Sequence, residues 1–300
     1  MKPIWDAHVH LFPQEIYQNW DRYAQLDPWF GALTRKPANG RGAGEAWCTP
    51  EEALAAADEA GVTGLIMQGW YWNDPGLISL HNDFMAQAMA DHPGRLLAFA
   101  AVNPVYGERA VAEVQRCAAL GFAGVGELGP GGNGYSFEDG RFRDVLDCAE
   151  ERKLPVCIHC GEPVGRPYPG RDTTPLEPLV ELLGQRPGLT VQLAHLGGGL
   201  PFYELNPRIR RKLEGHVYYD LAANPLLYDL RSVKAVISLV GVERLIYGSD
   251  FPLTLYPSQC RTPDFSRFIG QLQKEAGLST AEQEALFAQN VLQMLGGKSF

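Results

Sequence analysis

Short apolar runs alternate along the chain with segments of helical periodicity. Runs typical of buried strands lie at residues 4–10, 62–68, 95–102, 123–127, 154–159, 189–195, 216–221 and 244–250. Helical patterns separate most of them. Strands that alternate with helices form a parallel sheet with right-handed crossovers. The pattern therefore predicts an α/β protein.

The predicted helices have recognisable ends in several places. They cover residues 51–60, 79–91, 108–119, 142–152, 176–184 and 230–240, with two more near 263–276 and 280–295. Thr49 and Glu52 match a capping box before the first of these helices, and Gly61 closes it. Two extra helices therefore follow the last strand unit.

Eight strand units in about 250 core residues fit a (β/α)8 TIM barrel better than two doubly wound domains. An open nucleotide-binding sheet would need a glycine-rich loop after the first strand, where this chain has Leu11, Phe12 and Pro13. No linker or low-complexity stretch interrupts the chain. We expect one domain over residues 1–300, with an insertion at residues 11–48 that lies over the mouth of the barrel.

Composition and net charge restrict the classes of molecule that the protein is expected to bind. Hydrophobic residues make up 45% of the chain and charged residues 20%, and the formal charge is −9. We expect a cytoplasmic protein with a small-molecule substrate, because no apolar run reaches the roughly 20 residues of a membrane span and no signal-peptide pattern opens the chain. The acidic balance disfavours nucleic acid. Six cysteines are expected to be reduced, and Cys157 and Cys160 to be small buried hydrophobes rather than half of a zinc site.

Polar residues of one chemical kind end several of the predicted strands. His8 and His10 are two positions apart, so their side chains leave the first strand on the same face and supply half of a metal site. Glu127, His159 and His195 end later strands, and Asp250 ends the last. The carboxyl ends of all strands meet at one mouth of a barrel, so these residues are expected to be neighbours.

Each of these residues taken singly has an ordinary structural explanation. A histidine at a strand end can cap a loop, and Asp250 can begin a turn before Phe251 and Pro252. Their common position at one end of one barrel is hard to assign to chance. The constellation therefore indicates a metal centre.

Four motifs in order resemble the amidohydrolase superfamily. They are Asp6-Ala7-His8-Val9-His10, Val156-Cys157-Ile158-His159, Leu193-Ala194-His195-Leu196-Gly197-Gly198 and Tyr247-Gly248-Ser249-Asp250-Phe251-Pro252. Within that superfamily the chain is most similar to the branch of aminocarboxymuconate-semialdehyde decarboxylase. The likeness runs from residue 6 to about residue 255 and is specific for the fold, but weak for the substrate.

The resemblance implies a divalent metal, most often zinc, on His8, His10, His159 and Asp250. In a hydrolytic member the metal activates water, and Asp250 accepts its proton. His195 then ligates a second metal or donates a hydrogen bond to the developing oxyanion. Manganese is the alternative metal, and one or two ions can be accommodated.

Glu127 departs from the decarboxylase pattern. It resembles the fourth-strand glutamate of metal-dependent deoxyribonucleases and of some lactone or ester hydrolases in the superfamily, where it bridges two metals. Pairing of Glu127 with a loop arginine or with the strand-five region is the competing explanation, and the short pattern leaves the two evenly matched.

The substrate side of the predicted site is less defined. Trp70, Tyr71 and Trp72 follow the second strand, and Trp20, Trp29 and Phe30 lie in the insertion. These aromatics either line a pocket or pack the loops, and packing is the commoner case. Arg166 and Arg171, with Tyr168, follow His159, and Asn224 follows the seventh strand. An arginine fork there suits a carboxylate or phosphate group.

The leading expectation is a barrel of the metal-dependent hydrolase type that acts on a small carboxylated ester, lactone or amide. A nonoxidative decarboxylase on the same scaffold is the alternative. A nuclease and a barrel without catalysis rank below both. Barrels of this branch are often dimeric, so the resemblance also implies a homodimer.

Overall fold

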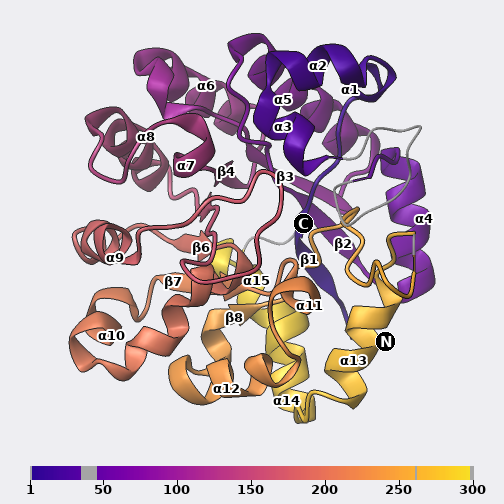
Figure 1. The fold of residues 1–300 in the computed structure, drawn as a ribbon, viewed down its shortest axis with the longest axis vertical. Coiled ribbons are helices and arrows are strands. Elements are labelled where there is room, and N and C mark those ends of the chain that lie inside the picture. Colours follow the sequence, from indigo (N-terminus) through magenta and orange to yellow (C-terminus); the bar gives the residue numbers. More distant parts are fainter. Residues whose placement is uncertain (1, 35–45, 261, 298–300) are drawn as a thin grey trace.

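Eight parallel strands surround a central axis in the order of the sequence (Figure 1). The computed structural model describes residues 2–34, 46–260 and 262–297. The strands are β1 (Trp5–Val9), β2 (Gly64–Met67), β3 (Leu96–Ala100), β4 (Gly124–Leu128), β5 (Val156–Ile158), β6 (Val191–Leu193), β7 (Val217–Asp220) and β8 (Leu245–Ile246). Every strand predicted from the sequence is present, and most are shorter than the apolar run that predicted them. The predicted (β/α)8 barrel is confirmed.

Contacts between the first and last strands close the barrel. Val9 and Phe251 form a parallel bridge, and the backbone N–H of Ala7 donates to the carbonyl of Tyr247 at 2.9 Å. The buried carboxylate of Asp6 strengthens the seam, since its Oδ1 accepts from the backbone N–H groups of His8 and Ser249, each at 3.0 Å. One side chain therefore fixes the backbone on both sides of the seam.

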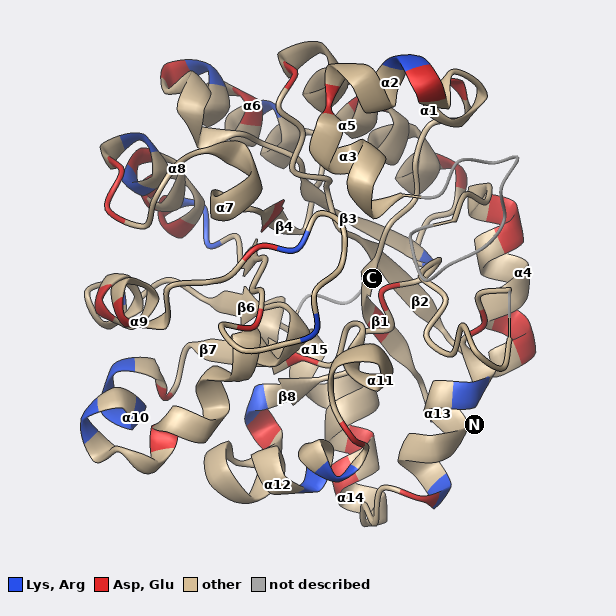
Figure 2. Ribbon diagram, viewed as in Figure 1, with Lys and Arg blue, Asp and Glu red and all other residues tan. Residues whose placement is uncertain are grey.

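An outer layer of helices covers the strands (Figure 1). It includes α4 (Pro50–Ala60), α5 (Pro75–Asp91), α6 (Glu108–Ala119), α8 (Gly140–Glu151), α9 (Leu176–Gly184), α10 (Pro207–Leu213), α12 (Arg231–Val240), α13 (Ser266–Lys274), α14 (Thr280–Glu284) and α15 (Asn290–Met294). Figure 2 shows that Lys, Arg, Asp and Glu lie mainly on these helices and on loops. Solvation of charged groups at the outside of a barrel explains this distribution.

The predicted signals at helix ends hold in the structure. Thr49 Oγ1 accepts from the N–H of Glu52 at 3.1 Å, and Glu52 Oε2 accepts from the N–H of Thr49 at 2.9 Å. Gly61 ends α4 with φ 73°, a left-handed conformation that favours glycine. Helix α5 begins four residues earlier than predicted, because Asp74 accepts from the N–H groups of Gly76 and Leu77.

The segment between β6 and β7 differs from the prediction. It folds into the helical turns η2 (His195–Leu205) and into α10, neither of which was expected. The glycine run Gly197–Gly199 has positive φ throughout, which interrupts helical periodicity and hides the segment from a pattern search.

The insertion after β1 is helical in its described part. It contains α1 (Gln14–Gln18), α2 (Trp20–Leu26) and α3 (Pro28–Leu33), and Phe30 is completely buried. Residues 35–45 of the predicted insertion lie outside the described residues. None of the helices described here is long and apolar enough to cross a membrane.

His81 is buried beneath the insertion and is not one of the histidines expected to bind a metal. His81 Nε2–H donates to the carbonyl of Leu11 at 2.8 Å, and its Nδ1 accepts from Trp72 Nε1–H at 3.0 Å. Burial lowers the pKa of His81 from 6.5 to about 4. The neutral ring is therefore part of the packed structure.

Acid should destabilise the fold through His81. The unfolded chain takes up a proton as the pH falls below about 6.5, whereas folded His81 resists it until about pH 4, so stability falls across that window by about 3 kcal/mol. His81→Gln keeps a donor and an acceptor and removes this titration. Urea unfolding of both proteins at pH 7.5 and pH 5 tests it, and an equal loss of stability in both would contradict the assignment.

Candidate metal centre

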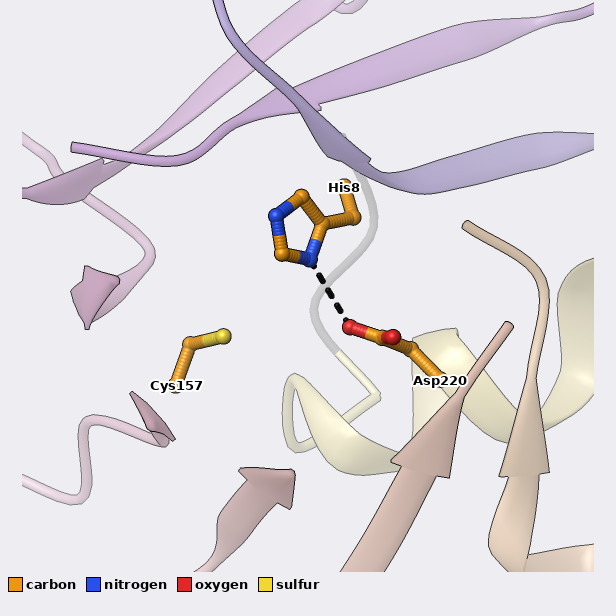
Figure 3. A group of neighbouring side chains, drawn as sticks. All are labelled: His8, Cys157 and Asp220. Carbon is orange, nitrogen blue, oxygen red and sulfur yellow. Dashed lines mark hydrogen bonds and ion pairs between the residues drawn. The ribbon is translucent and has the colours of Figure 1, made fainter. Parts of the chain in front are cut away.

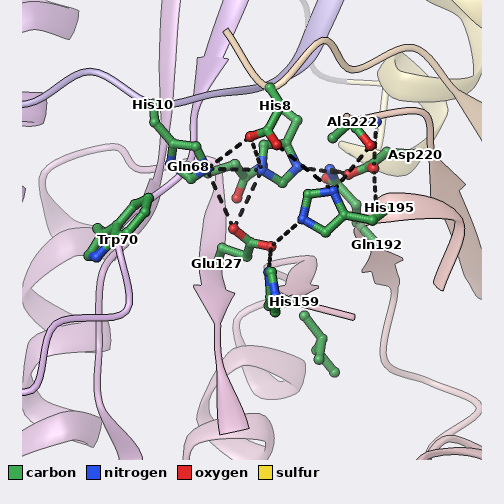
Figure 4. Close-up of polar contacts among 12 residues, drawn as sticks. His8, His10, Gln68, Trp70, Glu127, His159, Gln192, His195, Asp220 and Ala222 are labelled. Carbon is green, nitrogen blue, oxygen red and sulfur yellow. Dashed lines mark hydrogen bonds and ion pairs between the residues drawn. The ribbon is translucent and has the colours of Figure 1, made fainter. Parts of the chain in front are cut away.

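Four histidines and two carboxylates, those of Glu127 and Asp250, meet at the carboxyl ends of the strands. Figure 4 labels the four histidines and Glu127. Strand β1 carries His8 and is followed by His10, β4 carries Glu127, and His159 follows β5 directly. His195 and Asp250 come from the segments after β6 and β8. None of the six side chains belongs to a residue more than 8% exposed, so each charge among them needs a partner within the protein or a bound ion.

The first group has the spacing of a metal site. His8 Nε2 and His10 Nε2 are 3.1 Å apart, and each lies 3.5 Å from Glu127 Oε2. Asp250 Oδ1 lies 3.5 Å from His8 Nε2 and 3.4 Å from His10 Nε2. A tetrahedral ion with bonds of about 2.0–2.1 Å holds its ligand atoms about 3.3–3.4 Å apart. These distances therefore match the spacing of ligand atoms around one ion.

The second group shares Glu127 with the first. Glu127 Oε1 lies 2.8 Å from His159 Nδ1 and 3.5 Å from His195 Nε2. The ligand atoms of Glu127, His159 and His195 all lie within 4.8 Å of one another. Each oxygen of Glu127 thus faces a different group, as the carboxylate that bridges two metals does.

Hydrogen bonds direct lone pairs into both groups. His8 Nδ1 lies 2.8 Å from Asp220 Oδ2, and His195 Nδ1 lies 3.1 Å from the carbonyl of Ala222. These acceptors require a proton on Nδ1, which leaves a lone pair on Nε2 of each neutral ring. The lone pair of His8 faces the oxygens of Glu127 and Asp250. Such an arrangement is repulsive unless a proton or a cation lies between the atoms.

The pKa shifts report the same shortage of positive charge. Burial opposes protonation of His8, but the charges of Glu127 and Asp220 outweigh it and raise the pKa of His8 well above its usual value. Burial also disfavours the protonated form of His10, yet hydrogen bonds to Asp250 and Glu127 raise its pKa to about 9. Burial favours the neutral form of Glu127, and the charges of His159 and His8 overcome it, so its pKa lies well below the usual value. A bound divalent cation would supply the charge that these groups lack, so the residues present fit a metal.

The structure groups His159 differently from the prediction. His159 was expected to share one metal with His8, His10 and Asp250. In the structure Glu127 Oε2 lies 3.5 Å from both His8 and His10, and the ligand atom of His159 lies with those of Glu127 and His195. The reason is the path of β5, which enters the mouth beside β4 and β6 and brings His159 to the far oxygen of Glu127. The predicted set of ligands itself stays a prediction.

A third cluster, below the first group, is not a metal site by its chemistry. His8, Cys157 and Asp220 each offer one atom within 4.8 Å of the others, and Figure 3 shows the thiol beside the His8–Asp220 pair. Burial and the nearby charges of Glu127 and Asp220 raise the pKa of Cys157 well above its usual value, so the thiol is neutral. His8 Nδ1 already contacts Asp220. Cys157 and Cys160 are both buried.

Two of the site residues have a strained backbone. His195 has φ 56° and Asp250 has φ 67°, a region that side chains other than glycine rarely adopt. Strain of this kind persists only where the surroundings over-determine it and is concentrated at functional sites. It turns the side chains of His195 and Asp250 into the mouth, beyond the ends of β6 and β8.

Aromatic rings form one wall of the mouth. The centroid of Tyr71 lies 4.2 Å from that of Trp29 and 5.3 Å from that of His159. Trp70 packs on Tyr71 at 4.5 Å and on His10 at 5.2 Å. The aromatic residues predicted to follow β2 therefore pack against one another and also contact His10 and His159. From the insertion, Trp29 reaches the site with a centroid distance of 5.9 Å to His159.

The other predicted substrate residues lie further from the cluster. Arg166 is exposed, and Arg171 Nη2 donates to the carbonyl of Glu162 at 2.7 Å. Asn224 is buried and its Oδ1 accepts from Ser232 Oγ at 3.3 Å. Among the described residues no contact joins these three side chains to the histidines, so their substrate role stays a prediction.

Sequence inspection missed two carboxylates that contact the histidines. Asp220 ends β7 and bonds to His8, and Asp172 Oδ1 lies 3.2 Å from His159 Nε2. Asp220 ends a strand, as His8 and His159 nearly do, and that position could have revealed it. Asp172 lies within a proline-rich loop and carries no such signal.

A family comparison matches nearly the whole chain. The family described as Amidohydrolase aligns with residues 5–297. The chain belongs to this family. The resemblance inferred from the motifs around His8, His159, His195 and Asp250 is therefore confirmed.

Two relatives of this amidohydrolase are decarboxylases. It is 26% identical over 220 residues to 2-amino-3-carboxymuconate-6-semialdehyde decarboxylase of Dictyostelium discoideum, a match over 62% of this chain and 60% of the relative. It is 24% identical over 210 residues to gamma-resorcylate decarboxylase of a Rhizobium species, over 57% of this chain and 64% of the relative. Both matches span less than two thirds of the relatives' lengths.

Solved structures share the fold of this amidohydrolase. A 5-carboxyvanillate decarboxylase from Sphingomonas paucimobilis superposes with a TM-score of 0.75 and 17% identity, over 99% of both chains. A second 5-carboxyvanillate decarboxylase, from Novosphingobium aromaticivorans with bound manganese, gives a TM-score of 0.72 and 16% identity, over 98% of this chain and 96% of the other. Identities this low show the fold alone.

The aromatic wall depends on a glycine in α7 (Pro130–Asn133). A Cβ on Gly132 would lie 1.4 Å from Cε3 of Trp29, so Gly132→Ala should displace the indole and destabilise the protein by about 1–3 kcal/mol. Gly140→Ala is the matched control, because a Cβ there meets no described atom within 4 Å. Urea unfolding compares the two. Equal stability of the two variants would show that Trp29 does not pack as described.

Proposed function

We propose that this member of the family is a metal-dependent carboxy-lyase, which removes carbon dioxide from a small planar carboxylic acid without oxidation. Both relatives named above are decarboxylases, which supports this reaction over the hydrolysis expected from the motifs. The observation that best supports the proposal is the position of Asp250. Its Oδ1 faces His8 and His10, and its Oδ2 lies 3.9 Å from His195 Nδ1.

We assign one or two divalent ions to the groups described above. His8, His10, Glu127 and Asp250 would hold one, and Glu127, His159 and His195 would hold the other. When bound, such an ion supplies Lewis-acid stabilisation of the substrate's negative charge. Zinc suits imidazole and carboxylate ligands, and manganese is bound in the related 5-carboxyvanillate decarboxylase.

The residues of the chain account for the remaining requirements of decarboxylation. The bond between a substrate carbon and its carboxylate breaks, carbon dioxide leaves, and the electron pair left on the carbon must take a proton. Asp250 would carry that proton on Oδ2, which lies 3.9 Å from His195 Nδ1. Tyr71 and Trp29 give a flat substrate an aromatic surface next to His159.

Hydrolysis of a carboxylated ester, lactone or amide is the second candidate. It is favoured by Glu127, because a carboxylate shared between two groups of ligands suits a centre that activates water between two ions. In that reaction Asp250 would take a proton from water and pass it to the leaving group. The scaffold is the same, but the two reactions differ in whether water enters the product.

Product analysis separates these reactions. Incubation of metal-loaded protein with dihydroxybenzoates and carboxyvanillate is expected to release carbon dioxide, with one proton from the solvent appearing on the product carbon. Reaction in deuterated water followed by mass spectrometry measures this. Oxygen-18 from labelled water in the product of an ester or lactone, without release of carbon dioxide from any acid, would replace decarboxylation by hydrolysis.

Asp250→Asn should retain the fold and lose turnover by about 10²–10⁴-fold, because the amide cannot supply the proton. Asp144→Asn, on the exposed face of α8, is the control and should retain wild-type turnover. Turnover is measured at saturating metal, with metal content determined on the same samples. Near-normal turnover of Asp250→Asn would exclude the proposed proton role.

A further inference from the structure

We propose that Asp172 is a positioning residue for one of the two ion positions, the one formed by Glu127, His159 and His195. Its carboxylate holds the ring of His159 so that Nδ1 faces Glu127. This inference rests on the proposed use of two ions and adds a specific control over one of them. It predicts that loss of Asp172 weakens one ion position and leaves the other intact.

The ring of His159 lies between two carboxylates. Its Nδ1 is 2.8 Å from Glu127 Oε1, and its Nε2 is 3.2 Å from Asp172 Oδ1. A neutral imidazole carries one proton. With the proton on Nε2 directed to Asp172, the lone pair of Nδ1 points to the side where Glu127 and His195 lie. Asp172 therefore selects the tautomer and the ring orientation that suit a ligand.

The same arrangement recurs at the other histidines with a fixed orientation. Asp220 Oδ2 lies 2.8 Å from His8 Nδ1, and the carbonyl of Ala222 lies 3.1 Å from His195 Nδ1. In each case the nitrogen that points away from the cluster has an acceptor. A carboxylate or carbonyl behind a metal-bound histidine commonly orients the ring and increases its basicity. Asp172 does for His159 what these groups do for His8 and His195.

Two glycines fix the place of Asp172. A Cβ on Gly161 would lie 2.4 Å from the backbone oxygen of Asp172 and 2.5 Å from its Oδ1, and a Cβ on Gly131 would lie 2.5 Å from its Oδ2. A larger residue at either position would have to push the aspartate away. The carboxylate is thus enclosed between the end of β5 and α7, where it reaches only one side of His159.

Backbone contacts hold the loop that carries Asp172 to the barrel. The N–H of Gly161 donates to Thr174 Oγ1 at 2.9 Å, and the N–H of Thr174 donates to the carbonyl of Gly161 at 3.0 Å. Trp29 Nε1–H donates to the carbonyl of Gly170 at 2.6 Å. Residues on both sides of Asp172 are therefore anchored, one to β5 and one to the insertion. A loop fixed in this way can determine the geometry of a ligand.

The placement argues against a purely structural role. Asp172 lies on a loop, its side chain is only 15% exposed, and His159 is the ion-pair partner found for it among the described residues. A buried carboxylate opposite a single imidazole has an energetic cost that packing does not require.

Metal binding by the wild type and three variants tests the proposal. Wild-type protein dialysed against Mn²⁺ or Zn²⁺ is expected to bind two ions. Asp172→Ala should bind one ion with wild-type affinity and the other about 10–100-fold more weakly. Asp172→Asn, whose amide oxygen can still accept from Nε2–H, should lie between them. Glu162→Gln, on the same loop, is the control and should bind both ions as wild type does.

A double-mutant cycle shows whether Asp172 acts through His159. His159→Ala removes the ligand itself, so adding Asp172→Ala to it should change ion affinity no further. Equilibrium dialysis with elemental analysis gives the number and affinity of ions, and electron paramagnetic resonance of the Mn²⁺ protein detects the coupling of a pair. The melting temperature of ion-free Asp172→Ala should stay close to that of ion-free wild type, because the role concerns the ion.

Specific outcomes would overturn the proposal. Two ions bound by Asp172→Ala with unchanged affinities would do so, and so would an equal loss at both positions, which indicates a structural role. A wild-type protein that binds a single ion removes the second position and this inference with it, while release of carbon dioxide can still be observed. If Asp172→Ala loses one ion selectively but the wild type releases no carbon dioxide, the positioning role of Asp172 is supported. Only the proposed decarboxylation is then rejected.

Discussion

Buried charge at the barrel mouth is the constraint on which the site depends. Glu127 and Asp250 have 1% and 5% of their surface exposed, and Asp220 is completely buried. Carboxylates removed from water need cations or several hydrogen bonds close to them. The four histidines meet this need only in part, because hydrogen bonds behind His8 and His195 leave their Nε2 atoms as acceptors. The arrangement of lone pairs, rather than the number of charges, suits the mouth of the barrel to a cation.

Glycine makes the rest of the site possible. The short helix α7 after β4 presents Gly131 and Gly132 to two segments that are far apart in the sequence, and the absence of a Cβ lets Asp172 and Trp29 approach. Gly170 then joins these segments, because its carbonyl accepts from Trp29. The insertion, the turn after β4 and the loop after β5 thus pack as one unit around His159.

The two candidate reactions would need the same charge stabilisation from this scaffold. A carboxylate leaving as carbon dioxide and a water molecule attacking an ester each place negative charge near a metal and call for a proton near Asp250. The relatives favour decarboxylation, whereas Glu127 between the two groups is a feature that hydrolysis uses well. Both possibilities rest on the same six side chains, so the fold restricts the reaction class but leaves the choice to the substrate and the ions.

The sequence by itself determined the barrel and most of the residues at its mouth. Short apolar runs, helix signals such as Thr49 with Glu52, and polar residues at strand ends are local features of the sequence. The strands of a parallel barrel must bring their carboxyl ends together. Tertiary structure alone decided how the residues are grouped. The pairing of Glu127 with His159, the contact of Asp172 and the fit of Trp29 onto Gly132 join segments 32, 13 and 103 positions apart. Such contacts depend on backbone approach and ring orientation, which residue type and spacing do not specify.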